Sequence, residues 1–235
     1  LEGAVALSPG FDTAGWFTRD AALFEHVGRV LLRDDAPAPR PTRLLFAEDA
    51  YAIADKPVAA AVRPLAEKAA KAIGQRGETK LFPAEPVVWR EAFRLLQARE
   101  IWQTDGAWIT RHRPKFGPDV QERFDLASKV TEADVAKPRQ VRQEAAARLD
   151  SLLAGNVVVC FPTAPCIAPK RDASFETLND VRLRSQELSC IAGLGGLPQI
   201  SVPAGTVDGA PVGLSFMGAR GTDTMLTALA AAIAS

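Results

Sequence analysis

The sequence has little cysteine and histidine, no excess of either charge and no long apolar run. Its 235 residues carry 28 Lys and Arg against 28 Asp and Glu. A chain without net charge is not expected to hold nucleic acid or an acidic membrane by bulk electrostatics, so neither is an expected partner. Because no apolar run approaches about 18 residues, the sequence predicts no membrane span.

The scarce cysteines and histidines narrow the chemistry further. Cys160, Cys166 and Cys190 are odd in number and lack paired two-residue spacing, which favours neither a disulfide framework nor a zinc site. We therefore predict a reducing, cytoplasmic location in which each thiol is a small buried hydrophobe. A catalytic cysteine or a serine triad needs a nearby base, and nothing places His26 or His112 in that position.

The beginning of the chain also lacks familiar signals. The residues Leu1 to Ala4 include no methionine and neither the basic start nor the apolar stretch of a signal peptide. We therefore expect the sequence to open within a longer protein.

Helical and strand-like patterns alternate through most of the chain. Val157–Phe161 is wholly apolar and rich in β-branched residues, which indicates a strand covered on both faces in the middle of a largely parallel sheet. Asp208-Gly209 predicts a hairpin turn, and Asp105-Gly106 predicts a turn after a helix. The pattern therefore predicts an α/β fold with a mixed, largely parallel central sheet and helices on both faces. Strands are expected at 43–47, 78–82, 157–161, 199–203 and 212–217, and helices at 21–32, 57–73, 86–103, 118–127, 131–154, 175–193 and 223–234.

The segment after the apolar strand is the first candidate site, since ligands of open α/β sheets gather beyond the carboxyl ends of strands. It reads Pro162-Thr163-Ala164-Pro165-Cys166. Thr163 offers a hydroxyl and Cys166 a soft apolar wall, but a rigid strand exit without a ligand is the competing interpretation.

A second candidate site surrounds the glycines near residue 195. Its members Ser189, Cys190, Gly193, Gly195 and Gly196 could let backbone approach a ligand or merely pack a helix on the sheet. The segment lacks the spacing of a nucleotide-binding loop. Residue chemistry alone therefore yields no complete active site.

Four ordered blocks give the chain a family likeness. It resembles the amidase signature family, most closely the indole-acetamide-hydrolase branch and its chloroplast-receptor relatives. The blocks are LSPGFDTAGWFTRD at 7–20, FPTAP at 161–165, GLGGLPQISVPAG at 193–205 and DGAPVGLSFMG at 208–218.

The resemblance implies an amide hydrolase that uses a Ser nucleophile, a second Ser held by a cis peptide and a Lys base, with no metal or cofactor. In such chemistry a desolvated Lys accepts a proton through the bridging hydroxyl, and backbone N–H groups stabilise the oxyanion. The family's Lys and its Gly/Ser-rich stretch lie upstream of the block that begins at Leu7, and no Gly-Gly-Ser-Ser-like run occurs here. The resemblance therefore implies that residues 1–235 are the C-terminal part of one amidase-like domain and contain no catalytic residue.

The resemblance also assigns a substrate-pocket wall and partners. The partners are a small-molecule amide, apolar or aromatic, and the N-terminal half of the protein, present as further residues or a separate chain; a homodimer stays open. If that half supplies neighbouring strands, 157–161 would have an unpaired edge. The implied wall residues are Thr163, Ala164, Pro165 and Cys166, joined by Ser189, Cys190, Gly193, Phe11, Asp12 and Thr13.

Two other function classes compete with the amidase interpretation. One is a non-catalytic, amidase-like binding or receptor module. The other is an unrelated α/β enzyme that uses Cys166 or Cys190 as nucleophile.

Overall fold

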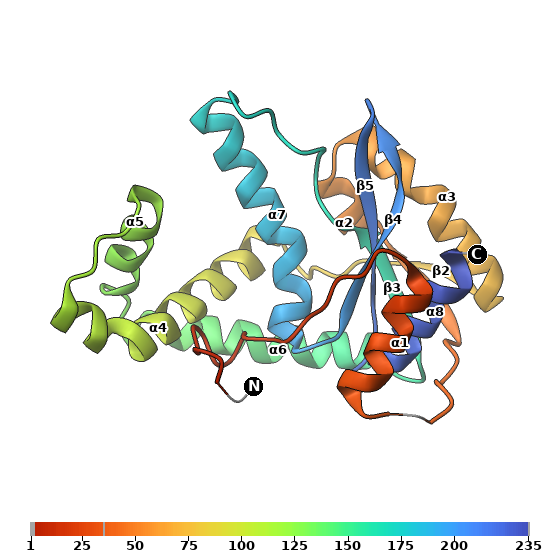
Figure 1. The fold of residues 1–235 in the computed structure, drawn as a ribbon, viewed down its shortest axis with the longest axis horizontal. Coiled ribbons are helices and arrows are strands. Elements are labelled where there is room, and N and C mark those ends of the chain that lie inside the picture. The colour runs from red at the N-terminus through yellow and green to blue at the C-terminus, as the bar shows by residue number, and fades with distance from the viewer. Residues whose placement is uncertain (1–2, 35, 235) are drawn as a thin grey trace.

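The computed structural model describes residues 3–34 and 36–234, so Leu1 and Glu2 of the sequence argument lie outside the described residues. A five-stranded sheet of order β2-β1-β3-β5-β4 has helices on both faces (Figure 1). β1 pairs in parallel with β2 and β3, and β5 pairs antiparallel with β3 and β4. The predicted α/β fold with a mixed, helix-covered sheet is confirmed. The strands are β1 (Arg43–Ala47), β2 (Arg76–Thr79), β3 (Val157–Pro162), β4 (Gln199–Val207) and β5 (Ala210–Met217).

Helices occupy most of the remaining chain, and their ends follow local sequence. Asp20 caps the first helix by accepting the Leu23 N–H at 2.7 Å, and Gly74 ends the third with φ +90°. Within the described residues, no helix is both long enough and apolar enough to span a bilayer. The helices are α1 (Ala21–Leu32), α2 (Glu48–Ile53), α3 (Lys56–Ile73), α4 (Pro86–His112), α5 (Pro118–Ala127), α6 (Ala136–Leu153), α7 (Phe175–Gly195) and α8 (Asp223–Ala234).

The expected turn at Asp105-Gly106 is wrong, because α4 continues to His112. Gly106 is buried, and a Cβ at that position would lie 2.8 Å from the Trp102 ring. The glycine therefore makes room for the indole on its own helix, and packing outweighs its poor helix propensity of about 1 kcal/mol. As a result α4 and α5 extend away from the sheet (Figure 1).

Two other elements begin at residues different from those predicted. The strand expected at 78–82 lies at Arg76–Thr79, where its backbone pairs with β1, while Leu81 and Phe82 are buried in the core. The helix expected from 131 begins at Ala136. Thr131 and Asp134 do exchange hydrogen bonds, but they close a turn ahead of the helix.

The expectation of an unpaired edge on the central strand is wrong. β3 has β1 on one side and β5 on the other, so both rows of its backbone groups have neighbours within the described chain. The outer strands of this sheet are β2 and β4. Strand order alone therefore gives β3 the central place that its apolar sequence predicts.

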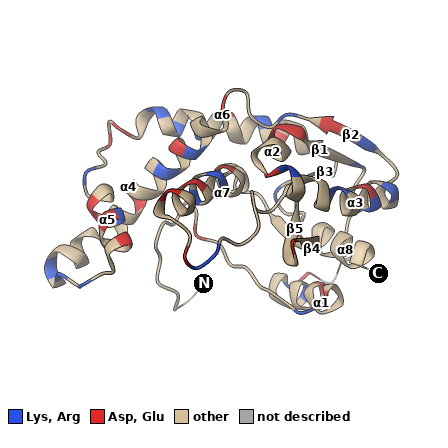
Figure 2. Cartoon of the chain, turned by 90° about the horizontal axis from the view of Figure 1, so that it is seen from above, with Lys and Arg blue, Asp and Glu red and all other residues tan. Residues whose placement is uncertain are grey.

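The two faces of the sheet differ in composition. The face toward α3 and α8, here called the apolar face, is apolar on β1, β3, β4 and β5. The face toward α4, α6 and α7, here called the divided face, is apolar on β1, on β3 and at Met217 of β5, but the β4–β5 hairpin also carries Ser201, Gly213 and Ser215 there. Neither hairpin strand contains a charged residue, whereas charges of both signs are mixed over the helices (Figure 2).

Candidate functional site

Three hydroxyl side chains meet on the divided face where β3 ends. Thr163 Oγ1 lies 2.8 Å from Ser201 Oγ and 2.9 Å from Ser215 Oγ. Gln199 Nε2 donates to Ser215 Oγ at 2.9 Å. The Thr163 N–H donates to the Gly213 carbonyl at 2.9 Å, which ties the exit of β3 to β5. We call the four side chains of Thr163, Gln199, Ser201 and Ser215 the hydroxyl cluster.

The hydroxyl cluster runs from the interior to the surface. Ser215 is fully buried, Thr163 is half-buried and Ser201 is exposed. A Cβ at Gly213 would lie 2.8 Å from Ser201 Oγ, so the glycine leaves the space that the hydroxyl uses. None of the four side chains is a base, and an unassisted hydroxyl is a weak nucleophile. The cluster is therefore equipped to bind a ligand rather than to attack it.

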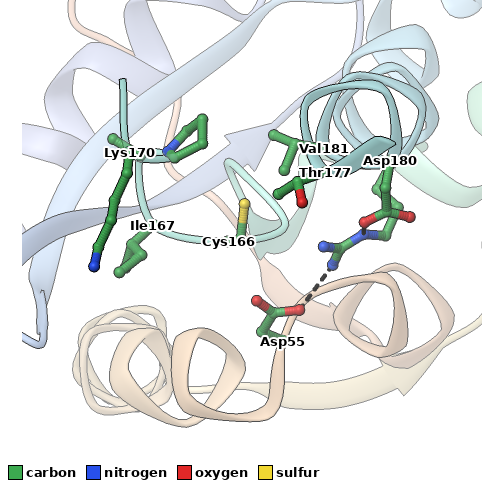
Figure 3. Close-up of a pocket in the computed structure, with 10 residues that line it drawn as sticks. Asp55, Cys166, Ile167, Lys170, Thr177, Asp180 and Val181 are labelled. Carbon is green, nitrogen blue, oxygen red and sulfur yellow. Dashed lines mark hydrogen bonds and ion pairs between the residues drawn. The ribbon is translucent and has the colours of Figure 1, made fainter. Parts of the chain in front are cut away.

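A cavity of about 270 Å³ lies between the segment after β3 and the beginning of α7 (Figure 3). Cys166 and Ile167 line it from the segment, and Thr177 and Val181 line it from α7. Lys170 stands at the far end of the segment (Figure 3). The walls are therefore apolar for much of their extent.

The charges in this cavity are mostly paired with one another. Arg184 donates to Asp55 Oδ1 at 2.8 Å and to Asp180 Oδ2 at 2.9 Å. The Asp55 N–H in turn donates to the Pro165 carbonyl at 2.7 Å. These contacts fix the segment after β3 against α7, and they leave Arg184 little capacity to attract an anionic ligand. Lys170, which also lines the cavity, has no ion pair among the described residues.

Burial disfavours the thiolate form of all three cysteines. Burial raises the pKa of Cys160 and of Cys190 to about 12. Burial also raises the pKa of Cys166, although nearby Arg184 opposes the shift. A thiolate is required for attack, so the structure gives no support to a cysteine nucleophile.

Two residues assigned by the resemblance do meet, near the end of α7. Phe11 packs edge-on against Phe93 with ring centroids 4.8 Å apart, and the Arg142 guanidinium lies 4.3 Å from the Phe11 ring centre. A Cβ on Gly193 would lie 3.0 Å from the Phe93 ring and 3.8 Å from Phe11. Gly193 is about 14 Å farther along α7 than Arg184 at 1.5 Å per residue, so this contact is distinct from the cavity.

The other predicted wall residues differ in their contacts and in their exposure to solvent. The Asp12 carboxylate accepts the N–H groups of Leu7 at 2.9 Å and Ser8 at 3.0 Å, and so closes its own turn. Cys190 is buried in the core beneath α7. The wall role of all ten predicted residues stays a prediction. Pro165 is buried, and the exposed members are Ala164, Ser189, Asp12 and Thr13.

Sequence reasoning missed the partners of Thr163 and the ion pairs of the cavity. Ser201 and Ser215 each alternate with apolar neighbours along their strands, which places them on the face opposite the apolar residues. That alternation was the available signal. The sequence contained no signal for the ion pair between Asp55 and Arg184, because these residues lie far apart in the chain. In the described part of the chain, no three His, Cys, Asp or Glu side chains group as a metal site requires.

Comparisons with known proteins agree on one family. A family model described as Amidase matches residues 67–227. Amidase 1 of Arabidopsis thaliana is 29% identical over 262 residues, covering 99% of this chain and 62% of the relative. The chloroplastic Outer envelope protein 64 of the same plant is 26% identical over 250 residues, covering 95% of this chain and 42% of the relative.

A solved structure described as an amidase shows the same fold. It superposes with a TM-score of 0.84 at 23% identity, and the match covers 98% of this chain and 54% of that one. The chain thus spans between 42% and 62% of the length of these three proteins.

Proposed function

Since this chain belongs to the amidase family, we propose that it is the part of an amide hydrolase that supplies the sheet core and a wall of the substrate pocket. The catalytic Ser, cis-Ser and Lys of the proposal lie upstream of it. The observation that carries the proposal is the hydroxyl cluster at the carboxyl end of β3, and the segment that follows Thr163 lines a cavity with apolar walls. Both lie within residues 67–227, the range matched by the family model, apart from Asp55 of the cavity.

The proposed reaction is cleavage of a C–N bond by a serine. The Ser oxygen attacks the amide carbon while its proton passes to the Lys, and the oxyanion is held by backbone N–H groups. The C–N bond then breaks, the leaving amine takes a proton, and water hydrolyses the acyl-serine. The reaction consumes only water, so the proposal includes no cofactor.

This chain's proposed role is to bind and orient the substrate. Cys166, Ile167 and Val181 offer an apolar wall, and Arg184 is already paired with Asp55 and Asp180. Lys170 also lines the cavity and has no ion pair among the described residues, so the pairing of Arg184 does not by itself exclude an anionic group. The apolar wall supports a neutral apolar or aromatic amide as the proposed substrate.

The proposal also names partners and a location. The N-terminal half of the amidase, as further residues or a separate chain, would complete the site, and a homodimer is compatible with it. The proposed location is the cytoplasm, because all three cysteines are free thiols and a reducing compartment keeps them so.

The test uses the protein expressed from its native gene with its native start. Neutral aromatic and aliphatic amides are compared with charged amides, and released amine is measured. Intact mass and terminal sequencing identify the polypeptide that carries the activity. We expect hydrolysis of neutral aromatic amides that a serine-directed fluorophosphonate abolishes; failure to hydrolyse any amide would contradict the proposal.

A second candidate function is a non-catalytic binding module. The observation that favours it is the 26% identity to Outer envelope protein 64 over 95% of this chain, since that name describes an envelope protein rather than an enzyme. The pocket of this module would hold a peptide or a partner and would release no amine. Turnover in the assay above would exclude it.

A further inference from the structure

Donor and acceptor roles in the hydroxyl cluster follow from Gln199, because either oxygen can donate in the Thr163–Ser215 and Thr163–Ser201 contacts. Gln199 Nε2 is only a donor, so Ser215 Oγ accepts from it at 2.9 Å. The Ser215 proton is then available for Thr163 Oγ1 at 2.9 Å, and the Thr163 proton for Ser201 Oγ at 2.8 Å. The last proton in this series belongs to Ser201, and no acceptor for it occurs among residues 3–34 and 36–234.

The surroundings of the series keep that direction. Ser215, near its beginning, is fully buried, so water does not compete for its proton. Thr163 is held in place by its backbone N–H bond to Gly213. Hydroxyls that accept and donate in series polarise one another, which makes the terminal O–H a better donor than an isolated serine. The exposed end of the series therefore presents a strengthened donor.

The chemistry of this end selects its ligand. With Thr163 as donor, Ser201 Oγ uses one of its two lone pairs, so its capacity for a ligand includes one donated hydrogen bond. β4 and β5 carry no charged residue, so the position offers no counter-charge for an ion. Uncharged acceptor oxygens, such as the carbonyl oxygen of an amide, fit this position best.

We propose that Ser201 is a substrate-binding residue whose hydroxyl donates to an uncharged acceptor oxygen of the amide substrate. This inference rests on the proposed function and adds to it a residue and a hydrogen-bond polarity. Thr163, Ser215 and Gln199 are then positioning residues, because they act through Ser201. The proposal adds Ser201 to the wall that the resemblance assigns to Thr163.

A substitution at Gln199 can reverse the donor direction of these hydrogen bonds and leave Ser201 unchanged. In Gln199→Glu the carboxylate is an acceptor, so the Ser215 proton turns toward it. The Thr163 proton then turns to Ser215 and the Ser201 proton to Thr163, which leaves Ser201 presenting lone pairs. Gln199→Glu should therefore weaken binding of an acceptor ligand as Ser201→Ala does.

The experiment compares wild type, Ser201→Ala, Gln199→Glu and the control Thr206→Ala, all expressed from the native gene. Thr206 is an exposed hydroxyl on the same strand outside the cluster. KM and kcat are measured on a hydrolysed amide, and the Kd of benzamide is measured by NMR titration. We expect Ser201→Ala and Gln199→Glu to raise KM and Kd about five- to tenfold, as for loss of one hydrogen bond. Both should leave kcat within about twofold, and Thr206→Ala should change nothing.

Several results would overturn the inference. One is wild-type KM and Kd in Ser201→Ala, an exposed position where the variant is expected to fold. Another is a lowered melting temperature in both variants with unchanged KM and Kd, which would mean that the hydroxyl serves packing against protein. A wild type that neither binds nor hydrolyses amides would defeat both proposals. A wild type that binds benzamide through Ser201 without hydrolysing any amide would uphold the inference and refute amide hydrolysis.

Discussion

The two faces of the sheet use the same strands but differ at the hairpin. On the apolar face, Leu214 and Phe216 of β5 continue the core, whereas on the divided face the alternate residues are Gly213 and Ser215. Ser215 is as fully buried as Phe216. It tolerates burial because Gln199 and Thr163 satisfy its hydroxyl. Burial of Phe216 thus adds to the apolar core, whereas burial of Ser215 fixes a hydrogen-bond series.

The largest difference is expected between the reaction rates of a thiol on the apolar face and a thiol in the cavity. Cys160 is fully buried on the apolar face and Cys166 lines the cavity. At pH 8 we expect a disulfide reagent to modify Cys166 at least about a thousandfold faster, because Cys160 reacts only after opening of the core and its raised pKa keeps it protonated. A fast phase that persists in Cys166→Ser would contradict this assignment.

The second largest effect is expected from truncation of a buried side chain on the apolar face. Phe216→Ala removes a fully buried ring from β5 and should lower the free energy of unfolding by about 3–5 kcal/mol. Denaturant unfolding followed by circular dichroism measures the loss. A loss below about 1 kcal/mol would show that this face does not hold the hairpin to the helices.

Substitution of the adjacent residue, on the divided face, should lower the free energy of unfolding by less. Ser215→Ala creates little cavity but leaves Gln199 and Thr163 short of a partner, so we expect a loss of about 1–2 kcal/mol in the same assay. A loss equal to that of Phe216→Ala would abolish the distinction between the faces.

The smallest effect is expected at Gly213. In Gly213→Ala the new Cβ would lie 2.8 Å from Ser201 Oγ, but the exposed serine can rotate away, so the loss should be about 1 kcal/mol. Gly15→Ala is the matched control, because no atom lies within 4 Å of its added Cβ. Equal effects at the two glycines would show that the Gly213 space is not used by the hydroxyl cluster.

Much of the fold followed from local patterns. The apolar, β-branched run of β3 correctly indicated a central strand, and Asp208-Gly209 forms the expected hairpin turn with φ +51° and +78°. The extension of α4 was missed because Gly106 is a helix breaker by local rules. Its packing against Trp102 is visible only in three dimensions.

The site was less predictable than the fold. Thr163 was expected at a site because it follows the central strand. Its partners Ser201 and Ser215 come from strands that the order β3-β5-β4 places beside it, and neither spacing nor composition encodes that order. Alternation along β4 and β5 gave the face of these serines but not their neighbours.

The central claim is that this chain binds the substrate while the nucleophile lies outside it. The direct test is to label the protein expressed from its native gene with a fluorophosphonate and to locate the modified serine by peptide mass spectrometry. We expect a labelled serine outside the 235 residues, with every serine of this chain unmodified, Ser189, Ser201 and Ser215 included. A label on any serine among the 235 residues would contradict the proposal.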